Sequence, residues 1–236
     1  MNFHLETIPV WEAVEQKSVC PICLLHQKCE TDETDRALGG SVMEPDERVR
    51  VNEKGICVKH HAQLFEAKNR LGHALMTDTH SIEIINKLQK LEEELHLSGK
   101  LFGKKTVLDT TLQQLHQMNT SCVICEEIEQ HMQRYLYTFI HLWKKDGKFA
   151  PAVAQGGLCL PHCEELLKMA QQCLSEAEQI KFTRFVLDIV LRDLQQNEQD
   201  LKWFTLKFDY RNQDKPWGNS KDALERTITQ LRGPFR

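Results

Sequence analysis

The sequence predicts a mainly α-helical, internally duplicated bundle with two zinc knuckles. Apolar residues recur at helical spacing along most of the chain, and alternating runs of β-branched residues are almost absent. A cysteine pair followed by a Cys-x-x-His motif also occurs twice, with the second copy 102 residues after the first. Repeated helical units that each hold a metal account for these observations together.

In the first half, an extended segment is expected up to residue 10, followed by a short helix at residues 11–16. A loop is expected within residues 30–51, which are polar and interrupted by two glycines and a Pro-Asp pair. Helices are predicted at residues 58–76 and 81–97, where leucine, isoleucine and alanine recur every three or four residues.

The segment at residues 97–105 carries two glycines and three lysines and is therefore predicted to be a linker. It divides the chain into an N-terminal repeat, residues 1–99, and a second repeat with a C-terminal aromatic arm and helix, residues 100–236.

Helices are predicted in the second half at residues 107–118, 126–145 and 177–194. The last of these is apolar around more than half of its circumference, which places it in the middle of the bundle. Aromatic residues gather at 203–210, where an arm packed across the bundle is expected. Asn219 or Ser220 can cap a final helix.

Composition narrows the class of protein. The chain has 236 residues, of which 41% are hydrophobic, and its formal net charge is -4. This is enough apolar material for one or two globular cores, and the balanced charge argues against a nucleic-acid partner. No secretory leader and no stretch of about 18 apolar residues is present, so a cytoplasmic protein without a membrane partner is expected.

The repeated motif contains the residues that bind metal. The first copy is Cys20-Pro-Ile-Cys23 followed after 33 residues by Cys57-Val-Lys-His60. The second copy is Cys122-Val-Ile-Cys125 followed after 33 residues by Cys159-Leu-Pro-His162. Three thiolates and one imidazole form a closed tetrahedral set that suits Zn²⁺, so two zinc ions per chain are predicted.

Beyond these donors, the two copies share few residues. Aligned at the fixed offset, they keep Ile22/Ile124, Val51/Val153, Gly55/Gly157 and Leu64/Leu166. The glycines precede each Cys-x-x-His motif, where a positive φ or a close approach to the metal is expected. Helix N-termini directed at the metal would stabilise the negative charge of three thiolates around Zn²⁺.

Two alternatives concern which residues share a metal. His61 follows His60 and Cys163 follows His162, and each of these neighbours is also a zinc donor; agreement between the copies favours His60 and His162. Pairing within each copy is the simpler arrangement, while a crossed arrangement would join Cys20 and Cys23 to Cys159 and His162. His26, Cys29, His131 and Cys173 are interpreted as ordinary packed or exposed residues.

Further elements resemble an uncharacterised bacterial family common among anaerobic Firmicutes and known only as a domain of unknown function. The resemblance covers nearly the whole chain and rests, besides the Cys/His motifs, on Leu5–Trp11, Met43–Asp46, Gly55–Cys57, Phe208–Arg211 and Pro216–Gly218. It implies a bacterial cytoplasmic protein and transfers no activity.

The sequence favours structural zinc in a binding or scaffold protein; it leaves the partner open, and a protein is the class considered. The first alternative is a thiol-based redox or metal-responsive sensor, in which oxidants or other metals reach the thiolates. An iron–sulfur protein or a zinc hydrolase is a further alternative. No phosphate-binding loop, metalloprotease motif or nucleophile elbow indicates an enzyme.

Overall fold

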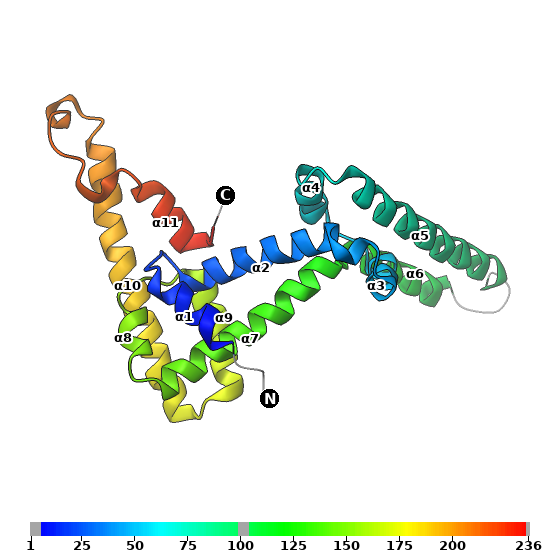
Figure 1. The fold of residues 1–236 in the computed structure, drawn as a ribbon, viewed down its shortest axis with the longest axis horizontal. Helices are drawn as coiled ribbons and strands as arrows, with labels where there is room; N and C mark the ends of the chain where they lie inside the picture. The colour runs from blue at the N-terminus through cyan, green and yellow to red at the C-terminus, as the bar shows by residue number, and fades with distance from the viewer. Residues whose placement is uncertain (1–5, 99–103, 235–236) are drawn as a thin grey trace. The chain divides into compact units, whose positions relative to one another are not determined.

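The computed structural model describes residues 6–98 and 104–234 (Figure 1). Within these residues the fold is all helical, with no strand, which confirms the predicted mainly α class. The α-helices are α1 (Thr7–Glu15), α2 (Pro21–Leu38), α3 (Pro45–Lys54), α4 (Val58–Glu66), α5 (Arg70–Ser98), α6 (Lys104–Thr120), α7 (Val123–Lys145), α8 (Phe149–Val153), α9 (Leu160–Cys173), α10 (Glu176–Leu206) and α11 (Ala223–Arg232). Short 3₁₀ turns occur at Gly40–Val42, Tyr210–Asn212 and Gly218–Ser220. No helix of the described residues is long and apolar enough to cross a membrane.

The chain folds into two compact units. Unit 1 comprises Met1–Lys28 and His131–Arg236, and unit 2 comprises Cys29–Gln130. The chain passes from one unit to the other within α2 and again within α7. These units therefore differ from the linear division at residues 99 and 100 that the glycine- and lysine-rich segment suggested.

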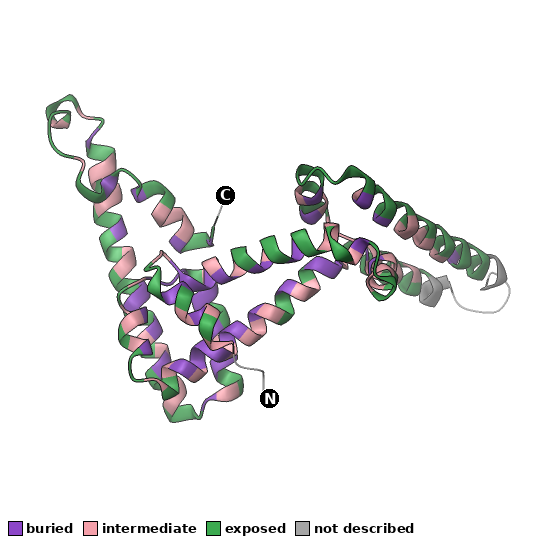
Figure 2. Ribbon diagram, in the orientation of Figure 1, coloured by how far each residue is buried: buried purple, intermediate pink, exposed green. Residues whose placement is uncertain are grey.

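Unit 1 has an aromatic and aliphatic core. Phe139, Phe149 and Phe182 are fully buried, and the Phe139 and Phe149 rings meet edge to face with centroids 4.9 Å apart. Helix α10 packs against α9 and α11, and buried and exposed residues alternate along it (Figure 2). Ile180, at 61%, and the aliphatic residues Leu187 and Leu191 of the same helix are exposed. The prediction that this helix lies in the middle of the bundle was therefore wrong.

The C-terminal aromatic residues pack locally. The Phe204 and Trp217 ring centroids lie 5.9 Å apart, and the Trp203 indole N–H donates to the Pro216 carbonyl at 3.0 Å. Phe208 and Tyr210 are exposed. These residues fold back onto the end of α10, and the arm expected to cross the bundle is instead a compact turn.

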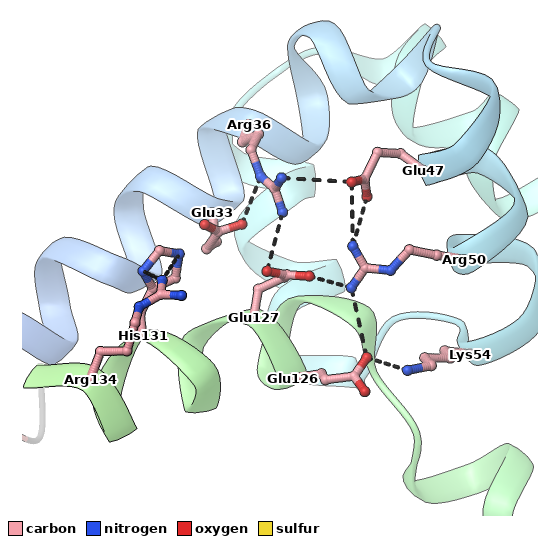
Figure 3. A network of polar contacts seen from close by, with 9 residues as sticks. All are labelled: Glu33, Arg36, Glu47, Arg50, Lys54, Glu126, Glu127, His131 and Arg134. Atoms are coloured by element: carbon pink, nitrogen blue, oxygen red, sulfur yellow. Dashed lines mark hydrogen bonds and ion pairs between the residues drawn. The ribbon is translucent and has the colours of Figure 1, made fainter. Parts of the chain in front are cut away.

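Unit 2 has a smaller core around Val51, Leu64, Met76 and Ile124. Helices α3 and α5 make its most extensive helix pairing. An ion-pair network joins the side chains of α2, α3 and α7 (Figure 3); its members are Glu33, Arg36, Glu47, Arg50, Lys54, Glu126 and Glu127. Because charged side chains from three helices neutralise one another, this unit gains fixed contacts that its small core does not supply.

Several helix boundaries in the structure differ from the predicted ones. The N-terminal segment is helical from Thr7, and the segment at residues 30–51 contains the end of α2 and all of α3 around a short loop. The break between the next two helices falls at residues 67–69, ten residues earlier than predicted. Helices α6, α7 and α10 confirm the predictions for the second half, and the predicted linker lies mostly outside the described residues.

Candidate metal centres

The first donor cluster lies in unit 1, between two helix N-termini. Cys20 immediately precedes α2 and Cys23 lies in its first turn. Cys159 is the N-cap of α9 and His162 lies in that helix's first turn. All four side chains are buried. Each motif places two donors at i and i+3, so both pairs face the same point from adjacent helix starts.

The donor atoms of this cluster are close enough to share one ion. His162 Nδ1 lies 3.1 Å from Cys159 Sγ, 3.3 Å from Cys23 Sγ and 3.6 Å from Cys20 Sγ. Cys23 Sγ and Cys159 Sγ lie 3.6 Å apart. With Zn–S bonds of about 2.3 Å and Zn–N bonds of about 2.0–2.1 Å, the edges of a tetrahedron are about 3.5–3.8 Å long. The cluster fits this geometry after small adjustments.

The second cluster, in unit 2, is built in the same way. Cys122 immediately precedes α7, Cys125 lies in its first turn, and Cys57 is the N-cap of α4, whose first turn carries His60. His60 Nδ1 lies 3.3 Å from Cys57 Sγ and 3.4 Å from Cys122 Sγ and Cys125 Sγ. Cys57 Sγ and Cys125 Sγ lie 3.8 Å apart. These distances also match the edges of a single-ion tetrahedron.

The sulfur atoms are not disulfide-bonded. All nine cysteines are free thiols. The S···S separations of 3.6 and 3.8 Å far exceed a covalent S–S bond of about 2.05 Å. The clusters are therefore sets of convergent thiols, which is the state that metal binding requires.

The donors group across the two sequence copies, not within them. Cys20 and Cys23 of the first copy meet Cys159 and His162 of the second, and the remaining four donors form the reciprocal set. The simpler pairing within each copy is therefore wrong, and the crossed arrangement is the one adopted.

Backbone contacts explain the crossing. The Gly157 N–H donates to the Ser18 carbonyl at 3.2 Å, and the Val123 N–H donates to the Gly55 carbonyl at 3.0 Å. In each unit, the segment before the Cys-x-x-His motif of one copy thus lies beside the Cys-x-x-Cys motif of the other.

Both glycines permit these close approaches. Gly55 has a φ of 71°, and a Cβ there would lie 2.5 Å from His80 Nε2. At Gly157, a Cβ would lie 2.6 Å from the Val19 carbonyl oxygen and 2.7 Å from Asp193 Oδ2. The positive φ expected from the sequence is confirmed at Gly55. The crowding comes from neighbouring protein atoms and explains why the copies agree at this position.

The structure also distinguishes between neighbouring candidate donors. His60 and His162 belong to the clusters, whereas His61 Nδ1 lies 2.7 Å from His73 Nε2 on α5. Cys163 is buried outside the clusters. His26, Cys29, His131 and Cys173 likewise do not belong to either donor set.

The electrostatics of the first cluster shift the pKa values of its donors in opposite directions. Burial alone would raise the pKa of Cys20, but hydrogen bonds with the other three cluster side chains lower it well below its usual range. Burial lowers the pKa of His162, whereas hydrogen bonds to Cys159 and Cys20 raise it to about 10. The pKa of Cys23 is raised by its contacts with the other two thiols. Without metal, the cluster therefore retains protons that a cation would displace.

The second cluster shows the same competition between thiols. Burial and the neighbouring Cys122 raise the pKa of Cys125 to about 12. Burial opposes ionisation of Cys57 too, but hydrogen bonds from the backbone of His60 and from the Cys122 thiol lower its pKa. Two helix N-termini in each cluster supply positive ends of helix dipoles, as expected from the sequence.

Acidic residues lie behind both histidines. Glu30 Oε1 is 3.5 Å from His60 Nε2, the ring nitrogen that faces away from the thiols, and Glu30 also pairs with Lys59. Glu165 Oε2 is 4.0 Å from His162 Nε2. A carboxylate that is hydrogen-bonded at this position fixes the orientation and tautomer of a metal-binding imidazole, and Glu30 lies closer to such a contact than Glu165 does. Sequence reasoning missed both residues, although Glu165 lies three positions after His162 on the same helix.

The fold and its donor clusters define an all-helical protein with two Cys₃His clusters able to bind metal ions. The chain belongs to a family of unknown function, DUF6062, whose pattern matches residues 1–236. No match was found among the curated proteins or among the solved structures.

Proposed function

We propose that this protein binds two structural Zn²⁺ ions, one in each unit. The observation that carries the proposal is the convergence of eight donors into two closed sets at tetrahedral spacing. The proposed ligands are Cys20, Cys23, Cys159 and His162 in unit 1, and Cys57, His60, Cys122 and Cys125 in unit 2.

The donor spacing separates zinc from its alternatives. A cluster of several iron atoms needs sulfurs further apart than the edges of a single-ion tetrahedron, so an iron–sulfur cluster fits poorly. Catalytic zinc keeps one position open for water, whereas four protein donors close each site. Zinc also prefers the mixture of thiolate and imidazole found in both clusters.

The contribution of each ion to stability is large. A structural zinc contributes about 10–16 kcal/mol of binding free energy to folding, against a net stability of about 5–15 kcal/mol for a typical domain. Each ion would join two helix N-termini that lie far apart in the sequence. The proposed metal is therefore required for the fold of its own unit.

The proposed biological role is that of a cytoplasmic binding or scaffold protein. A reducing compartment would keep the thiols available for zinc. Helices α5 and α6 support a protein partner, because they carry aliphatic side chains that are between 36% and 58% exposed: Leu75, Ile82, Ile85, Leu88, Leu95, Leu108, Leu112 and Leu115. Exposed aliphatic side chains on two paired helices are a feature of protein interaction sites.

Metal analysis of protein purified without added metal tests the zinc proposal. The expected result is two zinc ions per chain in a colourless protein. Substituting Cys159→Ser should lose one ion and unfold unit 1, and Cys57→Ser should lose the other and unfold unit 2. Cys173→Ser, at a half-buried thiol outside the clusters, is the matched control. The proposal would be contradicted by bound iron with visible absorption. Unfolding profiles of both ligand variants that match the wild type would contradict it as well.

A thiol-based sensor is the second candidate, and it is favoured by the accessibility of the second cluster. Cys125 is exposed and Cys57 is half-buried, whereas all four donors of the first cluster are buried. Oxidants and competing chelators reach accessible thiolates first. Mild peroxide should then release one zinc per chain while modifying Cys125 and Cys57. If both sites resist zinc release by peroxide equally, the sensor role is contradicted and only the structural role is supported.

A further inference from the structure

A polar cleft in unit 1 lies outside both metal centres. Its volume is about 370 Å³, and it is bounded by the turn between α1 and α2, the segment between α8 and α9, and one side of α10 and α11. A volume of this size accommodates a small metabolite. Neither the structural zinc nor the scaffold role uses the cleft.

One wall of the cleft contains a buried amide donor without an acceptor. Gln230 is 1% exposed, and its Nε2 has no hydrogen-bond partner among the described residues. Ser18 also lines the cleft. Its hydroxyl oxygen is buried and has no hydrogen-bond partner among the described residues. A buried polar group in this state carries the full cost of its lost hydration.

The orientation of this amide is fixed by its neighbours. Arg226 Nη1 lies 2.6 Å from Asn197, and a guanidinium can only donate, so the atom that faces it is Asn197 Oδ1. Asn197 Nδ2 then donates to Gln230 Oε1. The unpartnered end of the Gln230 side chain is therefore its Nε2 group, which carries donor hydrogens.

Within the described part of the chain, one of the cations that line the cleft has no ion-pair partner. Arg226 pairs with Asp200 at 3.0 Å and with Asp222 at 3.1 Å. Arg192 pairs with Asp193 at 2.6 Å. Lys17 lines the cleft and is exposed, and among the described residues it has no ion-pair partner. Its backbone has a φ of 49°, so the turn holds it in an uncommon conformation.

We infer that this cleft binds a small organic acid, whose carboxylate pairs with Lys17 and whose further oxygen accepts hydrogen bonds from Gln230 and Ser18 when these two side chains turn from the cleft wall toward the ligand. A hydroxy or oxo acid supplies both features in a few heavy atoms. The carboxylate would meet the unpaired ammonium, and the second oxygen would satisfy the buried donors. Neutral polar molecules would satisfy only the second requirement.

Titration calorimetry of the full-length, metal-loaded protein tests this inference. The probes are glycolate, lactate and pyruvate, with glycolamide and lactamide as uncharged counterparts. At least one acid should bind with a Kd below about 1 mM, and its amide at least about tenfold more weakly. Lys17→Gln should reduce the affinity about tenfold, whereas Lys181→Gln, an exposed lysine elsewhere in unit 1, should leave it unchanged.

Two further variants separate binding from folding. Gln230→Leu should abolish binding, and Ser18→Ala, which removes a single hydroxyl, should weaken it several-fold while the unfolding profile stays near that of the wild type. Absence of binding tighter than about 1 mM for all three acids would overturn the inference. Equal binding of acids and amides, or affinity unaffected by both Lys17→Gln and Ser18→Ala, would do the same.

Discussion

At the scale of single residues, chemical type identified the donors but not the groups behind them. Cys and His at regular spacing are recognisable because few other residues bind zinc. Glu30 lies thirty positions before His60, and nothing in its local sequence indicates that the two side chains meet. Such contacts depend on how helices pack, so they become visible only in the structure.

Glu30 is expected to tune the second zinc site. Glu30→Gln removes the charge that faces His60 Nε2 and the partner of Lys59. Loss of an outer carboxylate of this kind typically lowers metal affinity about 10–100-fold. Competition with a chromophoric chelator should therefore show weaker binding of one of the two zinc ions.

Glu165→Gln provides the matched control for this prediction. Glu165 lies further from its histidine, at 4.0 Å, and its side chain is 46% exposed, so solvent already screens its charge. Its substitution should change zinc affinity much less. Equal losses in the two variants would show that the distance from Glu30 to His60 has no particular importance.

At the scale of elements, periodicity located most helices but misplaced some of their ends. The predicted break after residue 76 does not occur: Thr77 and Ser81 lie within α5, where their hydroxyls donate to backbone carbonyls one turn earlier instead of capping a new helix. The break occurs after α4, where Lys68 takes a φ of 67° and ends the helix. A lysine in that conformation gives no sequence signal comparable to a glycine.

The Cys-x-x-Cys motifs were expected as separate knuckles and are in fact helix starts. Pro21 and Val123 begin α2 and α7 directly after the first cysteine of each motif. The N-terminal turn of a helix brings donors at i and i+3 to one side and adds the positive end of its dipole. The sequence indicated the donors correctly, but the same spacing is compatible with either a knuckle or a helix start.

The contact between α4 and α5 should make unit 2 sensitive to mild acid. His61 and His73 meet across it with their rings stacked, centroids 5.0 Å apart. Burial lowers the pKa of His61, and His73 and His80 lower it further; burial and Arg70 lower the pKa of His73. Neutral rings are thus favoured in the folded state. The stability from this contact is present above the ordinary pKa of about 6.5 and is lost as the pH falls through the lower folded values.

Unfolding midpoints measured between about pH 7.5 and 5.5 should show this loss in the wild type. His73→Gln removes one titrating ring and should reduce the slope, while His116→Gln, at an exposed histidine of α6, should leave it unchanged. Imidazole titration by NMR supplies an independent check. Folded pKa values at or above 6.5 for both rings would contradict the expectation.

At the scale of the whole molecule, the sequence left the pairing of the donor sets open. Both copies separate their motifs by the same 33 residues, so spacing is equally compatible with pairing within or across copies. The choice depends on contacts such as Gly157 to Ser18, which join segments more than a hundred residues apart. Crossing makes each unit depend on both halves of the chain, and a linear boundary near residue 100 could not reveal this.

Zinc-protected alkylation of the full-length chain distinguishes the two pairings. In the wild type, all six cluster cysteines should react slowly with N-ethylmaleimide. Cys20→Ser removes one ligand of the unit 1 set, so Cys23 and Cys159 should become labelled while Cys57 stays protected. Pairing within copies predicts instead that Cys57 loses its metal and becomes labelled, whereas Cys159 keeps its metal and stays protected.

The reciprocal variant completes this test. Cys122→Ser should expose Cys57 and Cys125 to the reagent and leave Cys159 protected, since the two donor sets share no residue. Peptide mass spectrometry measures each labelled site separately. The zinc bound per chain should fall from two ions to one in either variant. Labelling of all cluster cysteines after a single substitution would mean that the two units unfold together. Their stability would then arise from a cooperative interaction between the two metal sites and not from two independent ones.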